Sequence, residues 1–450
     1  IFINNFLRNF FLKNSARLRS LTKIFLNFLF AYISKPRIQK KPIGKVILFH
    51  HCVNGRTTNI EKKKICNYFT HLPYFIRTHN ISDTYGLFWA YNNLFSLKFF
   101  REMRSYKSFV PQDWLGLLDI IKVFLSLIKI KKNLKNYVAY KKKINLENLI
   151  DYEIHNQNTL DCFNFLCYIP AIKRWSSNLK ELTIIDQYQN MVFEHCLRFA
   201  VKKLPIPTKS IGFHHSLVSR DILSYHSLAG EWQSQVKPDK ILTIGKFGEN
   251  FLNKGGIPKK KIIQFYSLRQ KKIIKSKKDK NKIIVLLPIF IDSCFEILDM
   301  LTNINHVIKK NNYRIYIKFH PMLDKSKITN FFFRKKNNQN WKILNNNLYN
   351  ELQDAYLVIT SSSASVYDAV LNNCIPIVFK SELRQFDNYL DVFSILNKNI
   401  KSFEKNEIES FLKKDNKYKY FKESYIRQIK IIRNILINQT NFFTKKNFLK

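Results

Sequence analysis

The sequence contains few of the cysteines and turn-forming residues on which small disulfide-bonded folds depend. Its 450 residues include 10 glycines, 12 prolines and seven cysteines, and the cysteines are widely spread, without a C-x-x-C pair. An odd number of scattered cysteines excludes a disulfide framework, gives no sign of a structural zinc site and fits a reducing cytoplasm. Acidic residues are also scarce, with 32 Asp and Glu against 76 Lys and Arg, so the formal charge is +44.

Long apolar runs are missing as well. The stretch from Ile24 to Ile33 is too short to cross about 30 Å of hydrocarbon, and the run over 114–130 is interrupted by Asp119, Lys122 and Lys129. We therefore expect no transmembrane helix. Residues 1–40 hold eight Lys or Arg and no acid among apolar groups, which is typical of an amphipathic arm at a membrane interface. An ordinary helix packed on a core explains both stretches equally well.

The composition is that of a large globular protein with a basic surface. Hydrophobic residues make up 46% of the chain, which excludes a disordered basic tail, and the length allows two or three domains. The positive field attracts anions such as nucleotides, phospholipid head groups or acidic glycans. Binding to nucleic acid without catalysis remains an alternative, although no nucleic-acid module is recognisable.

From about residue 180 apolar strands alternate with helices. The strands over 283–288, 356–360 and 375–379 are apolar throughout, which predicts a parallel sheet covered on both faces, with ligands at the carboxyl ends of its strands. The chain is divided as follows: a basic amphipathic arm over 1–40, an N-terminal Rossmann-like domain over 41–269, a charged linker over 270–282, a C-terminal Rossmann-like domain over 283–402 and a basic helical tail over 403–450. The predicted fold class is α/β, with two doubly wound domains facing across a cleft.

A run of hydroxyl side chains follows one of these strands. Ser361, Ser362, Ser363 and Ser365 stand where the strand ends and a helix begins, an arrangement that suits a phosphate. Asp368 is spaced to share their helix face and accept hydrogen bonds from a sugar. The alternative is an ordinary N-cap in a tight turn.

A second candidate is the pair His320-Pro321 at the end of another strand, where an imidazole can stabilise a leaving phosphate. Arg269, before the linker, could reach a phosphate bidentately or lie on the surface. Upstream, Gln187, His214, His215 and Ser216 form an acceptor-side group, and Glu194 is the candidate general base. Neither histidine pair of the sequence, His50-His51 or His214-His215, has partners at ligand spacing, and no D-x-D triplet occurs. We therefore expect no metal.

Taken together, these segments resemble bacterial surface-carbohydrate biosynthesis proteins with a GT-B glycosyltransferase fold, over roughly residues 180–400. The His-Pro pair and the serines are similar to the donor-binding motifs of sialyltransferases and capsule Kdo transferases, and to those of CDP-glycerol glycerophosphotransferases. The resemblance implies that His320 assists the departing nucleotide phosphate, that Ser361 and Ser362 hold it and that Pro321 shapes the loop. The family's acidic base motif has no match, and Tyr266 stands where related proteins tend to have glycine.

The resemblance leads to a definite expectation. The protein would move a sugar from a nucleotide-activated donor, with a CMP-sugar favoured, to a cell-surface polysaccharide or lipid-linked glycan. It would use no cofactor or metal, and it would lie in the cytoplasm, peripheral to the inner face of the membrane, with its basic surface on anionic lipid and no specific nucleic acid. Transfer of a polyol phosphate from a CDP-activated donor is the alternative on the same scaffold.

Overall fold

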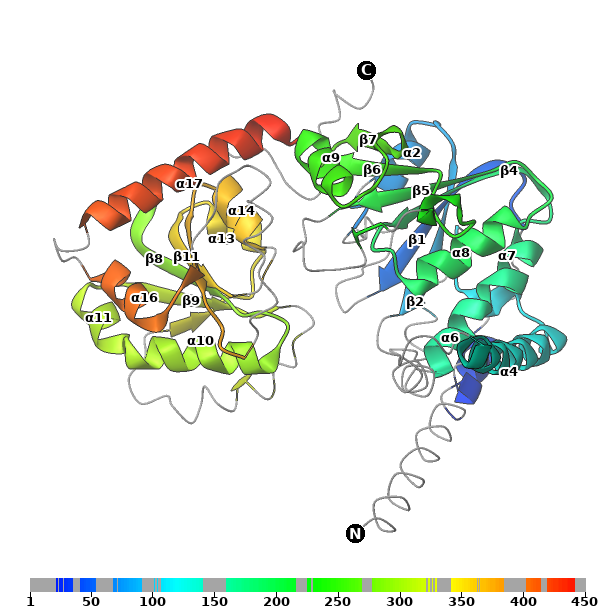
Figure 1. The fold of residues 1–450 in the computed structure, drawn as a ribbon, viewed down its shortest axis with the longest axis horizontal. Coiled ribbons are helices and arrows are strands. Elements are labelled where there is room, and N and C mark those ends of the chain that lie inside the picture. Colours follow the sequence, from blue (N-terminus) through cyan, green and yellow to red (C-terminus); the bar gives the residue numbers. More distant parts are fainter. Residues whose placement is uncertain are drawn as a thin grey trace, which may run out of the picture. The chain divides into compact units, whose positions relative to one another are not determined.

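The structure is a computed structural model. It describes residues 22, 24–26, 28–34, 41–53, 68–70, 72–90, 101, 103, 107–140, 159–215, 225–227, 230–268, 277–320, 323, 326, 328–329, 341–361, 363, 365–383, 402–413 and 419–441. Within these ranges the chain divides into two compact units, residues 1–213 with 229–240 and residues 214–228 with 241–450. The helices and strands are drawn in Figure 1.

The first sheet has seven strands in the order β3-β2-β1-β4-β5-β6-β7. Their bounds are Gly44–Val53 (β1), Asp83–Ala90 (β2), Ser108–Phe109 (β3), Leu179–Gln187 (β4), Thr208–His214 (β5), Lys240–Ile244 (β6) and Ile262–Phe265 (β7). β1 pairs in parallel with both β2 and β4. The order 3-2-1-4-5-6 is that of the Rossmann fold, here with a seventh strand at one edge.

Helices follow most of these strands. They are α2 (Leu72–Thr78), α4 (Leu117–Tyr140), α6 (Thr159–Leu166), α7 (Tyr168–Trp175), α8 (Val192–Lys202) and α9 (Gly245–Lys254), with short 3₁₀ turns at Pro111–Trp114, Glu231–Gln233 and Lys259–Lys261. α7 and α8 cover the centre of the sheet. Trp175 of α7 stacks on Phe109 at 4.8 Å and packs in one cluster with Leu48 of β1 and Leu197 of α8, all of them buried.

The second sheet has six strands in the order β10-β9-β8-β11-β12-β13. Their bounds are Asp279–Leu286 (β8), Arg314–Lys318 (β9), Trp341–Ile343 (β10), Ala355–Thr360 (β11), Ile375–Phe379 (β12) and Ser402–Phe403 (β13). Counted along the chain, this is again the order 3-2-1-4-5-6. The prediction of two Rossmann-like parallel sheets, the GT-B-like fold class, is confirmed by the two strand orders.

Both faces of the second sheet are covered. The helices are α10 (Ile291–Asn303), α11 (Asn305–Lys310), α13 (Leu348–Leu352), α14 (Ser365–Leu371), α16 (Lys405–Leu412) and α17 (Lys419–Gln439). α10, α11 and α16 lie on one side and α13 and α14 on the other (Figure 1). Alternate residues of β8 therefore enter different clusters, Ile283 and Val285 with α10 and α16, Ile284 and Leu286 with α13 and α14. This is why residues 283–286 of β8 are all apolar.

Two expectations from the sequence need adjustment. The charged run over 270–282 is not wholly a linker, since β8 already begins at Asp279 and residues 269–276 lie outside the described residues. The basic tail over 403–450 includes α17, which contributes Tyr425, Ile429, Ile432 and Leu436 to the core of the second unit.

Candidate functional site

The carboxyl edge of the second sheet is organised around β8. Leu286, the last residue of β8, is in register with Lys318 of β9 on one side and Thr360 of β11 on the other. The chain leaves this edge in opposite directions after β8 and β11, which makes it the topological switch point of a Rossmann sheet, where ligands bind. β9 and β11 are two strand spacings apart, about 10 Å, so groups on their ends can hold one phosphate between them.

Ser361 directly follows β11. The hydroxyl of Thr360 donates to the carbonyl oxygen of Leu286 at 3.0 Å, and this hydrogen bond joins the end of β11 to the end of β8. Ser361 is 1% exposed, and its Oγ has no hydrogen-bond partner among the described residues. A buried hydroxyl without a partner costs free energy, so the structure holds a donor ready for a ligand at the predicted position.

Ser293 is a second hydroxyl of this kind, and no sequence motif marks it. It lies in the first turn of α10, which begins after the connection 287–290 that leaves β8. Its side chain is fully buried, and its Oγ lacks a partner among the described residues. Ser293 sits inside an amphipathic helix pattern, where a serine is normally unremarkable, so only the strand order indicates its place.

His320 follows β9 by two residues and is partly exposed. Its carbonyl oxygen accepts a hydrogen bond from the backbone N–H of Leu323 at 3.1 Å. Pro321 lies outside the described residues. The strand order places β8 between His320, which follows β9, and Ser361, which follows β11, and the two residues belong to the same sheet edge.

The remaining residues predicted for the donor side have more local contacts. The backbone N–H of Ser365 donates to Oγ of Ser363 at 3.2 Å, which is the capping role considered as the alternative. Asp368 is buried and accepts a hydrogen bond from the Tyr349 hydroxyl at 2.8 Å. Ser362 and Arg269 lie outside the described residues.

On the first sheet, the predicted acceptor-side residues lie at strand ends but are enclosed. Gln187 ends β4 and is 1% exposed, with its side-chain oxygen unpartnered among the described residues. His214 ends β5, stacks on Phe251 at 5.6 Å and hydrogen-bonds the Thr243 hydroxyl at 3.2 Å. Burial lowers the pKa of His214 to about 3, so it is neutral at pH 7. His215 is buried beside it, and Ser216 lies outside the described residues.

Glu194 is part of a buried ion network, which argues against a role as general base. Arg198 donates to both oxygens of Asp186, at 2.8 and 2.6 Å, and to Oε2 of Glu194 at 3.1 Å. All three side chains are fully buried. Glu194 also accepts hydrogen bonds from two backbone N–H groups, of Gln189 and Asn190, the latter in the left-handed region at φ 58°. Its carboxyl group holds the turn after β4 and presents no exposed oxygen to an acceptor.

Burial and the neighbouring charges determine the pKa values of the carboxyl groups in this network. Burial raises the pKa of Glu194 to about 8, against the opposing effect of Arg198 and with a further contribution from Asp186. Burial also raises the pKa of Asp186. Lys237 extends the network: its Nζ donates to the side chain of Asn190 at 2.6 Å and pairs with Glu231. Burial away from water is thus the main reason why the ionised form of Glu194 is disfavoured, and the neighbouring carboxyl of Asp186 adds to it.

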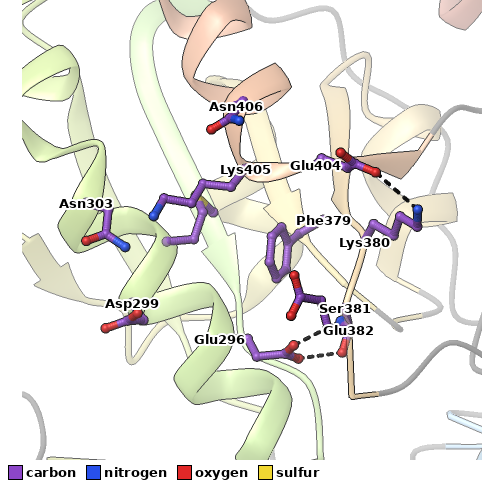
Figure 2. A pocket seen from close by; sticks show the side chains of 11 residues that line it. Glu296, Asp299, Asn303, Phe379, Lys380, Ser381, Glu382, Glu404, Lys405 and Asn406 are labelled. Carbon is purple, nitrogen blue, oxygen red and sulfur yellow. Dashed lines mark hydrogen bonds and ion pairs between the residues drawn. The ribbon is translucent and has the colours of Figure 1, made fainter.

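A pocket of about 520 Å³ opens in the second unit, apart from the predicted site residues (Figure 2). Glu296 of α10 points to the turn after β12, where its carboxylate accepts hydrogen bonds from the hydroxyl of Ser381 and from the backbone N–H of Glu382, the latter at 2.9 Å. Lys380 pairs with Glu404 at 3.1 Å across another wall. These contacts fasten the end of β12 to α10, which accounts for the carboxylates in the pocket.

Within the described ranges no group of three or more His, Cys, Asp or Glu side chains is placed to hold a metal ion. In those same ranges no helix has the length and apolar character needed to cross a membrane.

No family model matches the chain, and no curated protein matches it. Among solved structures it is similar to UDP-GlcNAc 2-epimerase from Neisseria meningitidis, at 11% identity and a TM-score of 0.45 over 88% of this chain and 99% of that one. A second is the glycotransferase of kitacinnamycin, at 7% identity and a TM-score of 0.46 over 89% and 97%. A third is MurG from Acinetobacter baumannii, at 9% identity and a TM-score of 0.44 over 87% and 95%. At TM-scores below 0.5 these likenesses carry no argument about this chain.

Proposed function

We propose that the protein is a glycosyltransferase that moves a sugar from a nucleotide-activated donor, with a CMP-sugar favoured, to a cell-surface polysaccharide or lipid-linked glycan. The observation that supports this is the edge around β8. There a buried hydroxyl without a described partner, Ser361, follows β11, and His320 follows β9, on either side of the switch point of a Rossmann sheet. A nucleotide phosphate is the ligand whose charge and hydrogen-bonding capacity fit such donors.

The proposed reaction breaks the bond between the anomeric carbon and the phosphate oxygen of the donor and forms a bond from that carbon to an acceptor hydroxyl oxygen. His320 donates a hydrogen bond to the phosphate as negative charge develops on it, and Ser361 donates a second. The acceptor proton passes to a base that we do not assign, because Glu194 is enclosed by its own hydrogen bonds. The proposal needs no cofactor or metal, so chelation with EDTA should leave transfer unchanged.

The proposal is tested by titrating the full chain with CMP, CDP, UDP, GDP and ADP and following binding by saturation-transfer NMR. We expect selective binding of a cytidine nucleotide, weakened about tenfold or more in Ser361→Ala and His320→Ala because each removes one hydrogen bond to a charged group. The matched control is His306→Ala, since His306 is 66% exposed on α11 and pairs with Glu409 at 3.4 Å. It should bind as the wild type does.

The other outcomes are equally informative. Preference for UDP or GDP would keep the site and overturn the donor class. Phosphorus in the product would indicate transfer of a polyol phosphate from a CDP-activated donor. Absence of nucleotide binding, or full binding by the Ser361→Ala variant, would overturn the proposed site. The expected location at the inner face of the membrane belongs to the same proposal and has its own structural basis.

A further inference from the structure

Two helical segments of the first unit pack against each other and leave apolar side chains in solvent. Residues 24–26 and 28–33 of the N-terminal arm are helical. Ile24 is buried in one cluster with Val123 and Leu127 of α4 and Phe163 of α6, and the ring of Phe28 lies 6.0 Å from that of Phe163. The arm is therefore docked on α4 and α6, and Figure 1 shows it beside α4.

α4 has a second apolar stripe on its exposed side. We call it the α4 surface. Its residues and exposed fractions are Leu117 (74%), Leu118 (68%), Ile121 (48%), Phe124 (38%), Leu125 (58%) and Ile128 (53%). The spacing i, i+4, i+7, i+11 places these side chains on one face of the helix, over about 17 Å. The opposite face is already used by Val123 and Leu127, so core packing does not explain the exposed stripe.

The arm repeats this feature. Phe25 and Tyr32 are 66% and 79% exposed, although Ile24 and Ala31 of the same helix are buried. Aromatic side chains of this kind have an apolar body and, in tyrosine, a polar end, which suits the boundary between head groups and acyl chains. Single exposed apolar residues are ordinary, whereas a continuous face on one helix with more beside it is a docking surface.

The charges around the α4 surface identify its partner. Lys122 and Lys129 are exposed on the same helix, and the one acid of α4, Asp119, pairs with Arg174 at 2.7 Å. The sequence of α4 contains five lysines, and residues 1–40 hold eight Lys or Arg without an acid. Exposed apolar groups flanked by cations and lacking unpaired acid are complementary to a membrane with anionic lipids.

We propose that the α4 surface binds the head-group boundary of an anionic membrane, with α4 lying in the plane of the interface. The proposal rests on the proposed function for its biological reason, since an enzyme with a lipid-linked acceptor must reach that acceptor at the membrane. Membrane binding itself does not require that function. The proposal predicts that apolar burial and the lysines both contribute to the affinity for the membrane, and the two contributions are separable because salt screens only that of the lysines.

The test is co-sedimentation of the full chain with vesicles of phosphatidylcholine, with and without phosphatidylglycerol. The wild type should bind the anionic vesicles more strongly, and added salt should weaken this binding. Leu118→Gln with Leu125→Gln should lower the partition coefficient about tenfold or more, because two side chains no longer gain apolar burial. The matched control is Ile81→Gln with Ile263→Gln, at positions 52% and 42% exposed outside the α4 surface.

Each result decides the question. The control pair should bind vesicles as the wild type does, and urea unfolding should show that both double variants are folded. Equal binding by the Leu118/Leu125 variant, or no binding by the wild type, would overturn the proposal. A wild type that is dimeric and becomes monomeric in that variant without losing vesicle binding would assign the surface to a second copy instead. Nucleotide binding should be unaffected in all variants, which separates this result from a failure of the proposed function.

Discussion

The two sheets share a strand order, but polar side chains near their carboxyl edges are partnered differently. At the end of β4 and in α8, Asp186, Arg198 and Glu194 satisfy one another and the backbone, and all are fully buried. After β11 and at the start of α10, Ser361 and Ser293 are buried with hydroxyls that have no partner among the described residues. The Arg198 network stabilises the protein itself, whereas the two serines keep hydrogen-bonding capacity for a ligand. The side chain of Gln187 at the end of β4 also has an oxygen without a described partner, so unused capacity is not confined to the second sheet.

The largest effect should come from breaking the buried network of the first sheet. Arg198→Met leaves the carboxyl groups of Asp186 and Glu194 buried without the guanidinium that binds them, and we expect the free energy of unfolding to fall by about 3–5 kcal/mol. The measurement is urea unfolding at pH 7.

The control is Arg174→Met in the same unit, because Arg174 is 52% exposed and its ion pair with Asp119 is open to solvent. It should lower the free energy of unfolding by at most about 1 kcal/mol. If both variants lose the same amount, the Arg198 network is no more structural than a surface ion pair and the contrast between the two edges fails.

A smaller effect should separate a partnered buried serine from an unpartnered one. The hydroxyl of Ser210 donates to Asp239 at 3.1 Å and accepts from the backbone N–H of Asp239 at 3.2 Å. Ser210→Ala should therefore lower the free energy of unfolding by about 1 kcal/mol, whereas Ser361→Ala should change it by less than about 0.5 kcal/mol. Urea unfolding measures both. A larger loss in Ser361→Ala than in Ser210→Ala would mean that Ser361 has a structural partner.

The smallest effect is a pH dependence carried by Glu194. Its pKa in the folded protein, about 8, lies above the ordinary value of 4.5, so the folded state binds more protons between these values. The free energy of unfolding should consequently fall as pH rises through this window, and the fall from pH 7 to 8.5 should be reduced in Glu194→Gln. His50, His51 and His214 do not contribute there, because burial lowers their pKa values, and their protonation lowers the free energy of unfolding only below about pH 6.5.

Glu181→Gln is the matched control for this measurement. Glu181 is an exposed carboxylate whose pKa is lowered by its hydrogen bond to Lys45, so it is ionised in both states above pH 7. Its replacement should leave the slope between pH 7 and 8.5 as in the wild type. An unchanged slope in Glu194→Gln would show that Glu194 is ionised in the folded protein at pH 7.

The second sheet was easier to predict than the first for a physical reason. β11, β12 and residues 283–286 of β8 are buried on both faces and are almost continuously apolar, and the hydroxyls of Ser361 and its neighbours follow such a run directly. β2 contains Asp83, Thr84 and Gly86, and β3 has only two residues, so neither gives a clear pattern.

The site residues also differ in how far local sequence could identify them. Ser361 is visible in the sequence because its place at a strand end is local information. Arg198 and Asp186 are 12 residues apart, and their pairing depends on how α8 packs on β4, so Glu194 looked available in the sequence when it is not. Ser293 could be identified only from the strand order, because its place beside the switch point is all that distinguishes it from other serines in helices.

The docking of α17 has a consequence for how the protein is made. Ile283 of β8 and Leu436 of α17 belong to one core, and 436 − 283 = 153 residues separate them. At about 5–20 residues per second, the ribosome needs roughly 8–30 s to synthesise that stretch. During this time the apolar faces of the second sheet await their last helix, whereas the first Rossmann sheet has all of its strands. We expect chaperones that bind nascent chains to recognise the second half of this protein and to release it only when α17 has emerged.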